Sequence, residues 1–197
     1  MNKNYKFNLL VVSVFCISFL FFACSSANKS IYNNDFQLTS QRAFSRDSSY
    51  SILVPQGWFY SFDNDCNCSD IFLVRQDLNA SLSNLQINYK TNSDFDLIKN
   101  KLLDYSKIMK EAELKNKLIE IGKPEFFNIG NIQCAAYQYY NNESLPVRTV
   151  LYKFDNRYFE LNAYITEDGL KNKIIPADLY NAQNTILGTL KSNRLFK

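Results

Sequence analysis

The chain has 197 residues, of which 46% are hydrophobic and 21% charged, a composition that suits one globular domain with a buried core. Aromatic residues make up 15% of it, and this content excludes intrinsic disorder. Histidine is absent, so a Ser-His-Asp triad, a Cys-His pair and His-containing zinc sites are excluded. Catalysis would have to rest on carboxylates, lysine, tyrosine or cysteine, which makes an enzyme the less favoured class, and we predict no cofactor and no bound metal.

The first 23 residues are typical of a signal peptide. Lys3 and Lys6 form a short basic start, and an apolar run from Leu9 to Ala23 follows. This run is shorter than the roughly 20 residues of a membrane-spanning helix. Cleavage of the signal peptide removes two of the 22 basic residues, so the mature chain has 20 basic and 19 acidic residues. The mature chain is therefore nearly neutral, and no basic block favours nucleic-acid binding.

The end of the leader resembles the lipobox of bacterial lipoproteins. The segment Leu20-Phe21-Phe22-Ala23-Cys24 places a small residue directly before a cysteine, although Phe21 stands where leucine is usual. The resemblance implies that Cys24 receives a diacylglycerol and begins the mature chain. Two or three acyl chains hold a protein firmly on a membrane, since each buried CH₂ contributes ~0.8 kcal/mol. The alternative is plain secretion, with cleavage after Ala27.

The residue after the cysteine indicates whether a lipoprotein stays in the inner membrane or moves to the outer membrane. Ser25 in this position, in place of Asp, resembles lipoproteins that move on to the outer membrane. We expect a lipid-anchored protein of the bacterial cell envelope, on the outer membrane in preference to the inner one. Residues 24–35 are polar apart from Ile31 and Tyr32 and predict a flexible tether between the lipid and a domain at 36–197.

The first part of this domain reads as short strands. Residues 50–54 run into the turn Pro55-Gln56-Gly57, and Trp58 leads out of it. Residues 71–75 predict a second strand, and the alternation of apolar and polar residues over 84–90 predicts a third with one buried face.

A helix is predicted next, followed by four strands and a second helix. Ser93 and Asp96 have the spacing of a capping box, and the apolar positions behind them have the period of an amphipathic helix: Phe95, Ile98, Leu102, Tyr105 and Met109. A solvated helix face is predicted from four lysines interspersed with two glutamates: Lys107, Lys110, Lys115, Lys117, Glu111 and Glu113.

The C-terminal half predicts strands at 118–127, 132–140, 147–154 and 157–165. Asp155-Asn156 is expected to form a two-residue hairpin turn. Pro176 marks the start of the closing helix, whose apolar side holds Leu179, Ala182, Ile186 and Leu190. This order of elements predicts the α+β class, an antiparallel sheet with amphipathic helices packed on it.

The segment from Tyr50 to Trp58 resembles the strand–Pro–x–Gly–Trp opening of the PsbP-like superfamily. The order of elements, Ile129-Gly130-Asn131 before a strand, and the closing segment 186–192 support the resemblance over residues 36–195. That superfamily includes an extrinsic photosystem subunit, a Ran-binding import factor and bacterial lipoproteins. The resemblance implies an accessory, assembly or binding module on a membrane with an envelope-protein partner, and it transfers no binding residue.

Three cysteines remain after the leader and Cys24: Cys66, Cys68 and Cys134. An exported protein can form disulfides. A bridge from Cys134 to Cys66 or Cys68 would close a long loop, whereas a Cys66–Cys68 bridge would be strained. The other interpretations are inert thiols, thiol redox chemistry at Cys66 and Cys68, and a soft-metal site. We favour a structural disulfide or inert thiols.

The same region has a calcium-like spacing of oxygen ligands at Asp63, Asp65 and Asn67. The loop lacks the glycine that should follow, where Cys68 stands, and the final glutamate, where Val74 stands. We interpret it as an Asx-rich turn.

Tyrosines are concentrated in the C-terminal strands: Tyr137, Tyr139, Tyr140, Tyr152, Tyr158 and Tyr164. The preferred interpretation is cross-strand aromatic packing. The alternative is an exposed aromatic face, which would make the protein a surface lipoprotein that binds a ligand or a host molecule.

Overall fold

The computed structural model describes residues 36–61, 69–90, 93–115 and 118–193, and the account below concerns this part of the chain. The strands are β1 (Leu38–Phe44), β2 (Tyr50–Pro55), β3 (Trp58–Ser61), β4 (Ile71–Arg75), β5 (Ala80–Ile87), β6 (Ile119–Glu120), β7 (Glu125–Ile129), β8 (Ile132–Tyr140), β9 (Pro146–Phe154), β10 (Arg157–Ile165) and β11 (Lys191–Ser192). The helices are α2 (Phe95–Glu113), α3 (Glu167–Lys171) and α4 (Pro176–Leu187).

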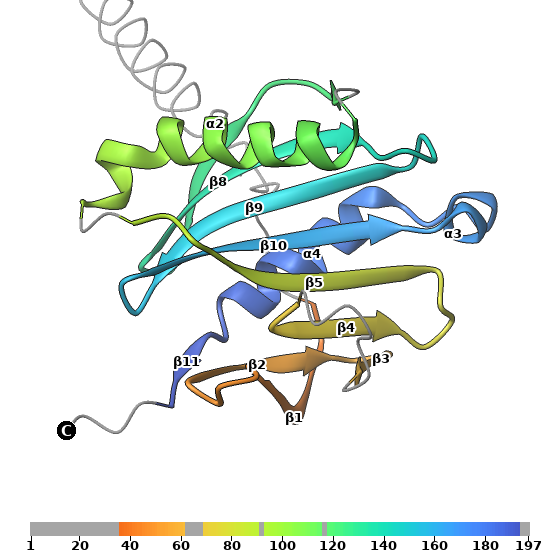
Figure 1. The fold of residues 1–197 in the computed structure, drawn as a ribbon. Coiled ribbons are helices and arrows are strands. Elements are labelled where there is room, and N and C mark those ends of the chain that lie inside the picture. The colour runs from red at the N-terminus through yellow and green to blue at the C-terminus, as the bar shows by residue number, and fades with distance from the viewer. Residues whose placement is uncertain (1–35, 62–68, 91–92, 116–117, 194–197) are drawn as a thin grey trace, which may run out of the picture. The chain divides into compact units, whose positions relative to one another are not determined.

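The strands form two antiparallel sheets (Figure 1). The large sheet has the order β3-β4-β5-β10-β9-β8-β6, with β7 also paired to β8. The small sheet has the order β1-β2-β11 and so joins the first and last strands of the described chain. With the helices, this is the α+β architecture that the sequence predicts.

Both faces of the large sheet are buried. Side chains alternate along each strand, so every strand contributes residues to both faces. On one face Phe159, Leu161 and their neighbours pack with the small sheet and α4. On the other face Tyr158 and residues of β8 and β9 pack under α2. This division confirms the two faces expected for the strand 157–165.

The β9–β10 hairpin forms as predicted. Asp155 and Asn156 have φ angles of 46° and 59°, the left-handed backbone that a two-residue type I′ turn requires at both positions. The turn fixes the register, in which Phe154 pairs with Arg157.

Two details of α2 differ from the sequence-based expectation. Its N-cap is Asp94 and no side chain caps it, so the predicted capping box is wrong: the Asp96 carboxylate instead accepts bonds from Lys99 and Gln133. The buried stripe also shifts along the helix, because a 3.5-residue repeat drifts ~20° per heptad on a 3.6-residue helix. Met109 is consequently exposed, and Lys110 is buried.

The closing helix begins with Pro176 at its first turn, as predicted, and buries Leu179, Ala182 and Ile186. It ends at Leu187, earlier than the apolar pattern indicates, with Gly188 at its C-cap. Leu190 packs against the core from the segment that follows. No helix in the described ranges is long and apolar enough to cross a membrane.

Candidate functional site

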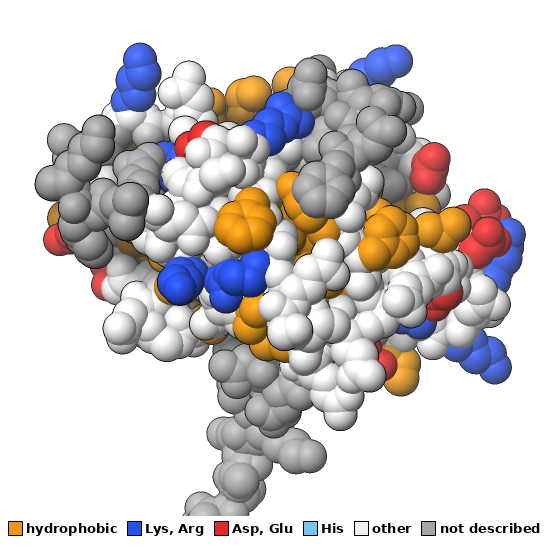
Figure 2. Space-filling view, turned by 90° about the horizontal axis from the view of Figure 1, so that it is seen from below, with side chains coloured by type: hydrophobic (Ala, Val, Ile, Leu, Met, Phe, Trp, Pro, Cys, Tyr) orange, Lys and Arg blue, Asp and Glu red, His pale blue; other side chains and the backbone are white. Residues whose placement is uncertain are grey.

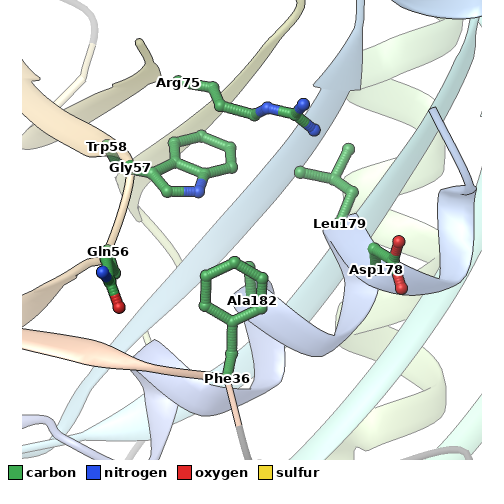
Figure 3. Close-up of a pocket in the computed structure, with 8 residues that line it drawn as sticks. All are labelled: Phe36, Gln56, Gly57, Trp58, Arg75, Asp178, Leu179 and Ala182. Atoms are coloured by element: carbon green, nitrogen blue, oxygen red, sulfur yellow. The ribbon is translucent and has the colours of Figure 1, made fainter.

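A cavity of about 330 Å³ lies where the start of β1, the β2–β3 turn, the end of β4 and the first turns of α4 meet (Figure 3). We call it the Trp58 pocket. Its lining residues come from four separate stretches of the sequence: Phe36, Gln56, Gly57, Trp58, Arg75, Asp178, Leu179 and Ala182.

The β2–β3 turn builds one wall of the Trp58 pocket. Gly57 has a φ of +79°, a conformation that is easy for glycine and strained for other residues. The Gly57 carbonyl accepts a 2.9 Å bond from the Gln76 N–H, and Trp58 pairs with Arg75 across β3 and β4. The predicted Pro–x–Gly turn therefore places Trp58 and Arg75 side by side.

Helix α4 builds the opposite wall. Leu179 and Ala182 are three positions apart, so they lie on one face of the helix, and both are nearly fully buried. Asp178 stands in the first turn, where the helix dipole favours a negative charge. The pocket thus has an apolar base and an acidic residue at its rim.

The remaining wall is the point where the chain enters the described fold. The Phe36 N–H donates a 3.3 Å bond to Thr185 Oγ1 of α4, and the Phe36 side chain packs against the core. At the rim, Arg75 donates from Nη2 to Asp77 Oδ2 over 2.6 Å, with both side chains more than a third exposed. An exposed pair of this kind contributes about 0–1 kcal/mol.

Trp58 supplies a polar atom inside this cavity. Its side chain is only 5% exposed, and the indole nitrogen points into the space between Phe36 and Leu179 (Figure 3). No acceptor in the described part of the chain bonds to this N–H. Buried tryptophans usually find a partner for the indole N–H, so this donor is open to a ligand.

The tyrosine-rich strands do not form an exposed aromatic face. Four of the six rings (Tyr137, Tyr139, Tyr152 and Tyr158) are at most 3% exposed, and Tyr140 is 40% exposed. Tyr152 of β9 stacks on its cross-strand neighbour Phe159 of β10 at 5.4 Å, and Tyr137 stacks on Tyr139 within β8 at 5.7 Å. Cross-strand packing is therefore confirmed, and the exposed-face hypothesis is wrong because α2 and α4 cover the two faces on which these rings lie.

A buried polar cluster lies under α2, which we call the Lys110–Glu160 network. Lys110 Nζ lies 2.9 Å from Glu160 Oε1, and both side chains are 9% exposed. Glu160 also accepts bonds of 3.1 Å from Ser106 Oγ and from Asn162 Nδ2. The prediction that Lys110 belongs to a solvated face is wrong.

The pKa values in this network follow from burial and from the ion pair. Burial by itself would lower the pKa of Lys110, but the Glu160 carboxylate beside it raises that pKa above its ordinary value. Burial raises the pKa of Tyr137, whose hydroxyl bonds to Ser106. These groups bond to one another, so the cluster is suited to holding α2 on the sheet.

Cys134 has a free thiol that is 1% exposed, in the core on the α4 side of β8. The predicted pairing partners, Cys66 and Cys68, lie outside the described residues, so the disulfide and the thiol chemistry stay predictions. The same holds for Cys24 and for the turn with Asp63, Asp65 and Asn67. In the described ranges no three His, Cys, Asp or Glu side chains are grouped to hold a metal.

We predict that the Cys134 thiol is inert in the native protein. Burial raises its pKa to about 12, and the thiolate is the reactive form. Iodoacetamide at pH 8 should leave Cys134 unmodified after an hour in native buffer and should alkylate it fully in 6 M guanidinium chloride, as read by peptide mass spectrometry. Rapid native labelling would contradict the burial, and the exposed thiol of a Ser40→Cys variant provides the control for reagent activity.

The sequence predicted the turn that forms one wall of the pocket, but it did not predict the pocket. The Pro55–Trp58 turn was visible as a motif, whereas Phe36, Arg75 and Asp178 carry no local signal that would connect them. Residues 71–75 were predicted as a strand, but only the register between β3 and β4 shows that Arg75 lies beside Trp58.

Comparison with known proteins supports the fold. Neither a protein-family model nor a curated protein sequence matches the chain. The solution structure of cyanobacterial PsbP (CyanoP) from Synechocystis sp. PCC 6803 matches with a TM-score of 0.52 and 13% identity, over 77% of this chain and 91% of that one. LpqN, involved in cell envelope biogenesis of Mycobacterium tuberculosis, matches with a TM-score of 0.45 and 15% identity, over 81% and 94%. The match to CyanoP, together with the sheets and helices described above, shows a PsbP-like α+β fold.

Proposed function

We propose that this protein is a lipid-anchored, non-catalytic accessory or assembly factor of the bacterial cell envelope, which binds an envelope partner at the Trp58 pocket. The observation that carries the proposal is the position of Phe36. This residue lies just before β1, its N–H donates to Thr185 of α4, and its side chain lines the pocket. The segment that leads from the lipidation site therefore joins the domain at the edge of the pocket.

The length of the tether limits how far the pocket can be from the lipid. Residues 24–35 span at most about 40 Å when fully extended, at 3.3–3.6 Å per residue. An acylated Cys24 would keep the pocket within that distance of the bilayer surface, where partners on the same membrane are within reach.

The composition of the pocket is that of a binding site. Small-ligand and peptide sites combine an apolar base with a few placed polar groups, and here the base holds Phe36 and Leu179 beside the open indole N–H. The neighbouring side of the molecule, formed by β1 and β2, also has hydrophobic side chains grouped near its centre with Lys and Arg beside them (Figure 2). Phe44 at the end of β1 is 46% exposed.

The intact mass of the membrane-extracted protein tests the anchor. We expect a chain that begins at Cys24 and carries the added mass of a diacylglycerol and an amide-linked acyl group. A Cys24→Ala variant should lose this species, whereas Cys16→Ala, which changes the other leader cysteine, should keep it. A lipid-free chain that begins at Asn28, or an uncut chain from Met1, would contradict the proposal.

Location in the envelope is tested by separating the membranes on a density gradient. We expect the wild-type chain in the outer-membrane fractions, as the Ser25 position predicts. Recovery in the inner-membrane fractions would contradict the outer-membrane assignment and leave the lipid anchor in place.

A further inference from the structure

The Trp58 pocket offers a hydrogen-bond donor at the bottom of an apolar cavity. The indole Nε1–H has no acceptor among the described residues, and the side chain that carries it is 95% buried, since 5% is exposed. Phe36, Leu179 and Ala182 surround the space into which the N–H points. The nitrogen atom itself is accessible from the pocket, so a ligand that combines an acceptor with apolar bulk can pair with it and fill the space beside it.

The rim of the pocket indicates the charge of that ligand. Arg75 and Asp178 line it with opposite charges, and Arg75 is already paired with Asp77. An anionic ligand would be repelled by Asp178, and a cationic ligand would be repelled by Arg75. The rim therefore gives neither kind of ion a net electrostatic attraction. The acceptor that suits this rim is a neutral carbonyl.

The size of the cavity indicates the apolar part. A volume of about 330 Å³ lies at the small end of ligand pockets and holds one large side chain with its adjoining peptide groups. Gln56 is exposed at the rim, and its amide can both donate to and accept from a neighbouring peptide group.

We propose that the Trp58 pocket binds a peptide segment of a partner protein by one bulky apolar side chain, with a backbone carbonyl accepting the hydrogen bond from Trp58 Nε1–H. This inference rests on the proposed binding function and adds the class of partner. The side chain lies against Phe36, Leu179 and Ala182. The flanking peptide groups meet Gln56 and the two charged residues at the rim.

The sole tryptophan of the chain makes the test direct. Protein labelled with ¹⁵N at tryptophan gives one indole cross-peak, which is followed during titration with blocked peptides of the form acetyl-Gly-X-Gly-amide. With X as leucine or phenylalanine, we expect a saturable downfield shift of the indole proton, because the N–H acquires an acceptor. With X as glycine, saturation should require at least tenfold more peptide.

Variants separate the hydrogen bond from the apolar contact. Trp58→Phe, measured by calorimetry, should bind the leucine peptide about fivefold more weakly, the loss expected for one hydrogen bond. Phe59→Leu changes the next aromatic residue, which is 40% exposed and lies outside the pocket lining, and should bind as the wild type does. Urea unfolding midpoints identify any variant whose weaker binding reflects lost stability.

Three results would overturn the proposal. They are an indole resonance that no peptide moves, equal responses to glycine and leucine peptides, and a shift produced equally well by acetate, which would make the pocket an anion site. The intact mass, which shows whether the chain begins at Cys24 and carries lipid, does not depend on any of these three results. Failure of the peptide proposal is therefore distinguishable from failure of the lipid anchor.

Discussion

Removing the Glu160 carboxylate with a Glu160→Ala substitution is expected to lower the free energy of unfolding by about 3–5 kcal/mol, the cost of removing one partner from a buried ion pair. Lys110 is 9% exposed and has Glu160 at 2.9 Å as its buried partner. The substitution also removes the acceptor for Ser106 and Asn162. Urea denaturation followed by tryptophan fluorescence measures the change.

The matched control is Glu113→Ala, which removes the other carboxylate bonded to Lys110. Glu113 is 59% exposed and lies 3.1 Å from Lys110 Nζ, and exposed pairs contribute about 0–1 kcal/mol. Equal losses for the two variants would show that burial of the pair is not the cause. A Lys110→Met/Glu160→Gln double variant should lose less stability than the sum of its two single variants, because each single variant leaves one charge of the buried pair behind and the double variant leaves neither.

The pH dependence of this network follows from the raised pKa of Lys110, which the neighbouring Glu160 raises despite the opposing effect of burial. A lysine whose pKa is higher in the folded state stabilises that state fully below its unfolded pKa of about 10.4. This contribution is lost as the pH rises through the folded-state pKa. The stability that Lys110 contributes to the wild-type protein should therefore be unchanged from pH 7 to pH 9, as urea unfolding at several pH values measures.

Arg148→Ala is expected to destabilise the protein by about 2–6 kcal/mol, from about 1–3 kcal/mol for each of two buried acceptors left without a donor. Arg148 is 2% exposed and donates from Nη1 to Gln183 Oε1 at 2.7 Å and to Asn184 Oδ1 at 3.0 Å, both on α4. Its guanidinium also lies over the Tyr180 ring at 5.1 Å. The substitution leaves the two amide oxygens buried without this donor, and thermal or urea unfolding measures the loss.

Arg148→Lys is the informative comparison. A lysine keeps the charge but cannot reach several acceptors with the planar, forked geometry of the guanidinium, so we expect it to recover less than half of the lost stability. Full recovery would mean that the charge alone holds α4 to the sheet. Arg75→Lys, in an exposed ion pair, should change the stability by less than about 1 kcal/mol.

Much of the fold could be predicted because its signals are local. The alternation over 157–165 assigns each side chain to a face, and Asp155-Asn156 defines the hairpin turn. Pro176 marks the start of α4 for the same kind of reason, since proline is tolerated at the first helical position.

The burial of Lys110 and the assembly of the Trp58 pocket could not be predicted in the same way. Lys110 lies in a run of charged residues, and its burial depends on Glu160, which is 50 positions away and adjacent only through the packing of α2 on β10. The pocket likewise requires the chain entry, a strand pairing and the docking of α4 to be known together. Such tertiary contacts override local pattern.

The pairing of β11 with β2 affects the order in which the fold can be completed. Lys191 pairs with Ser51, 140 positions earlier, and the Asn193 N–H donates a 2.8 Å bond to the Ser49 carbonyl. Contacts this distant in sequence close slowly, because the entropy of a long loop is lost before any pairing is gained. During synthesis, one edge of β2 therefore stays unpaired until residues 191–193 emerge, and an open strand edge is a site where another chain can pair.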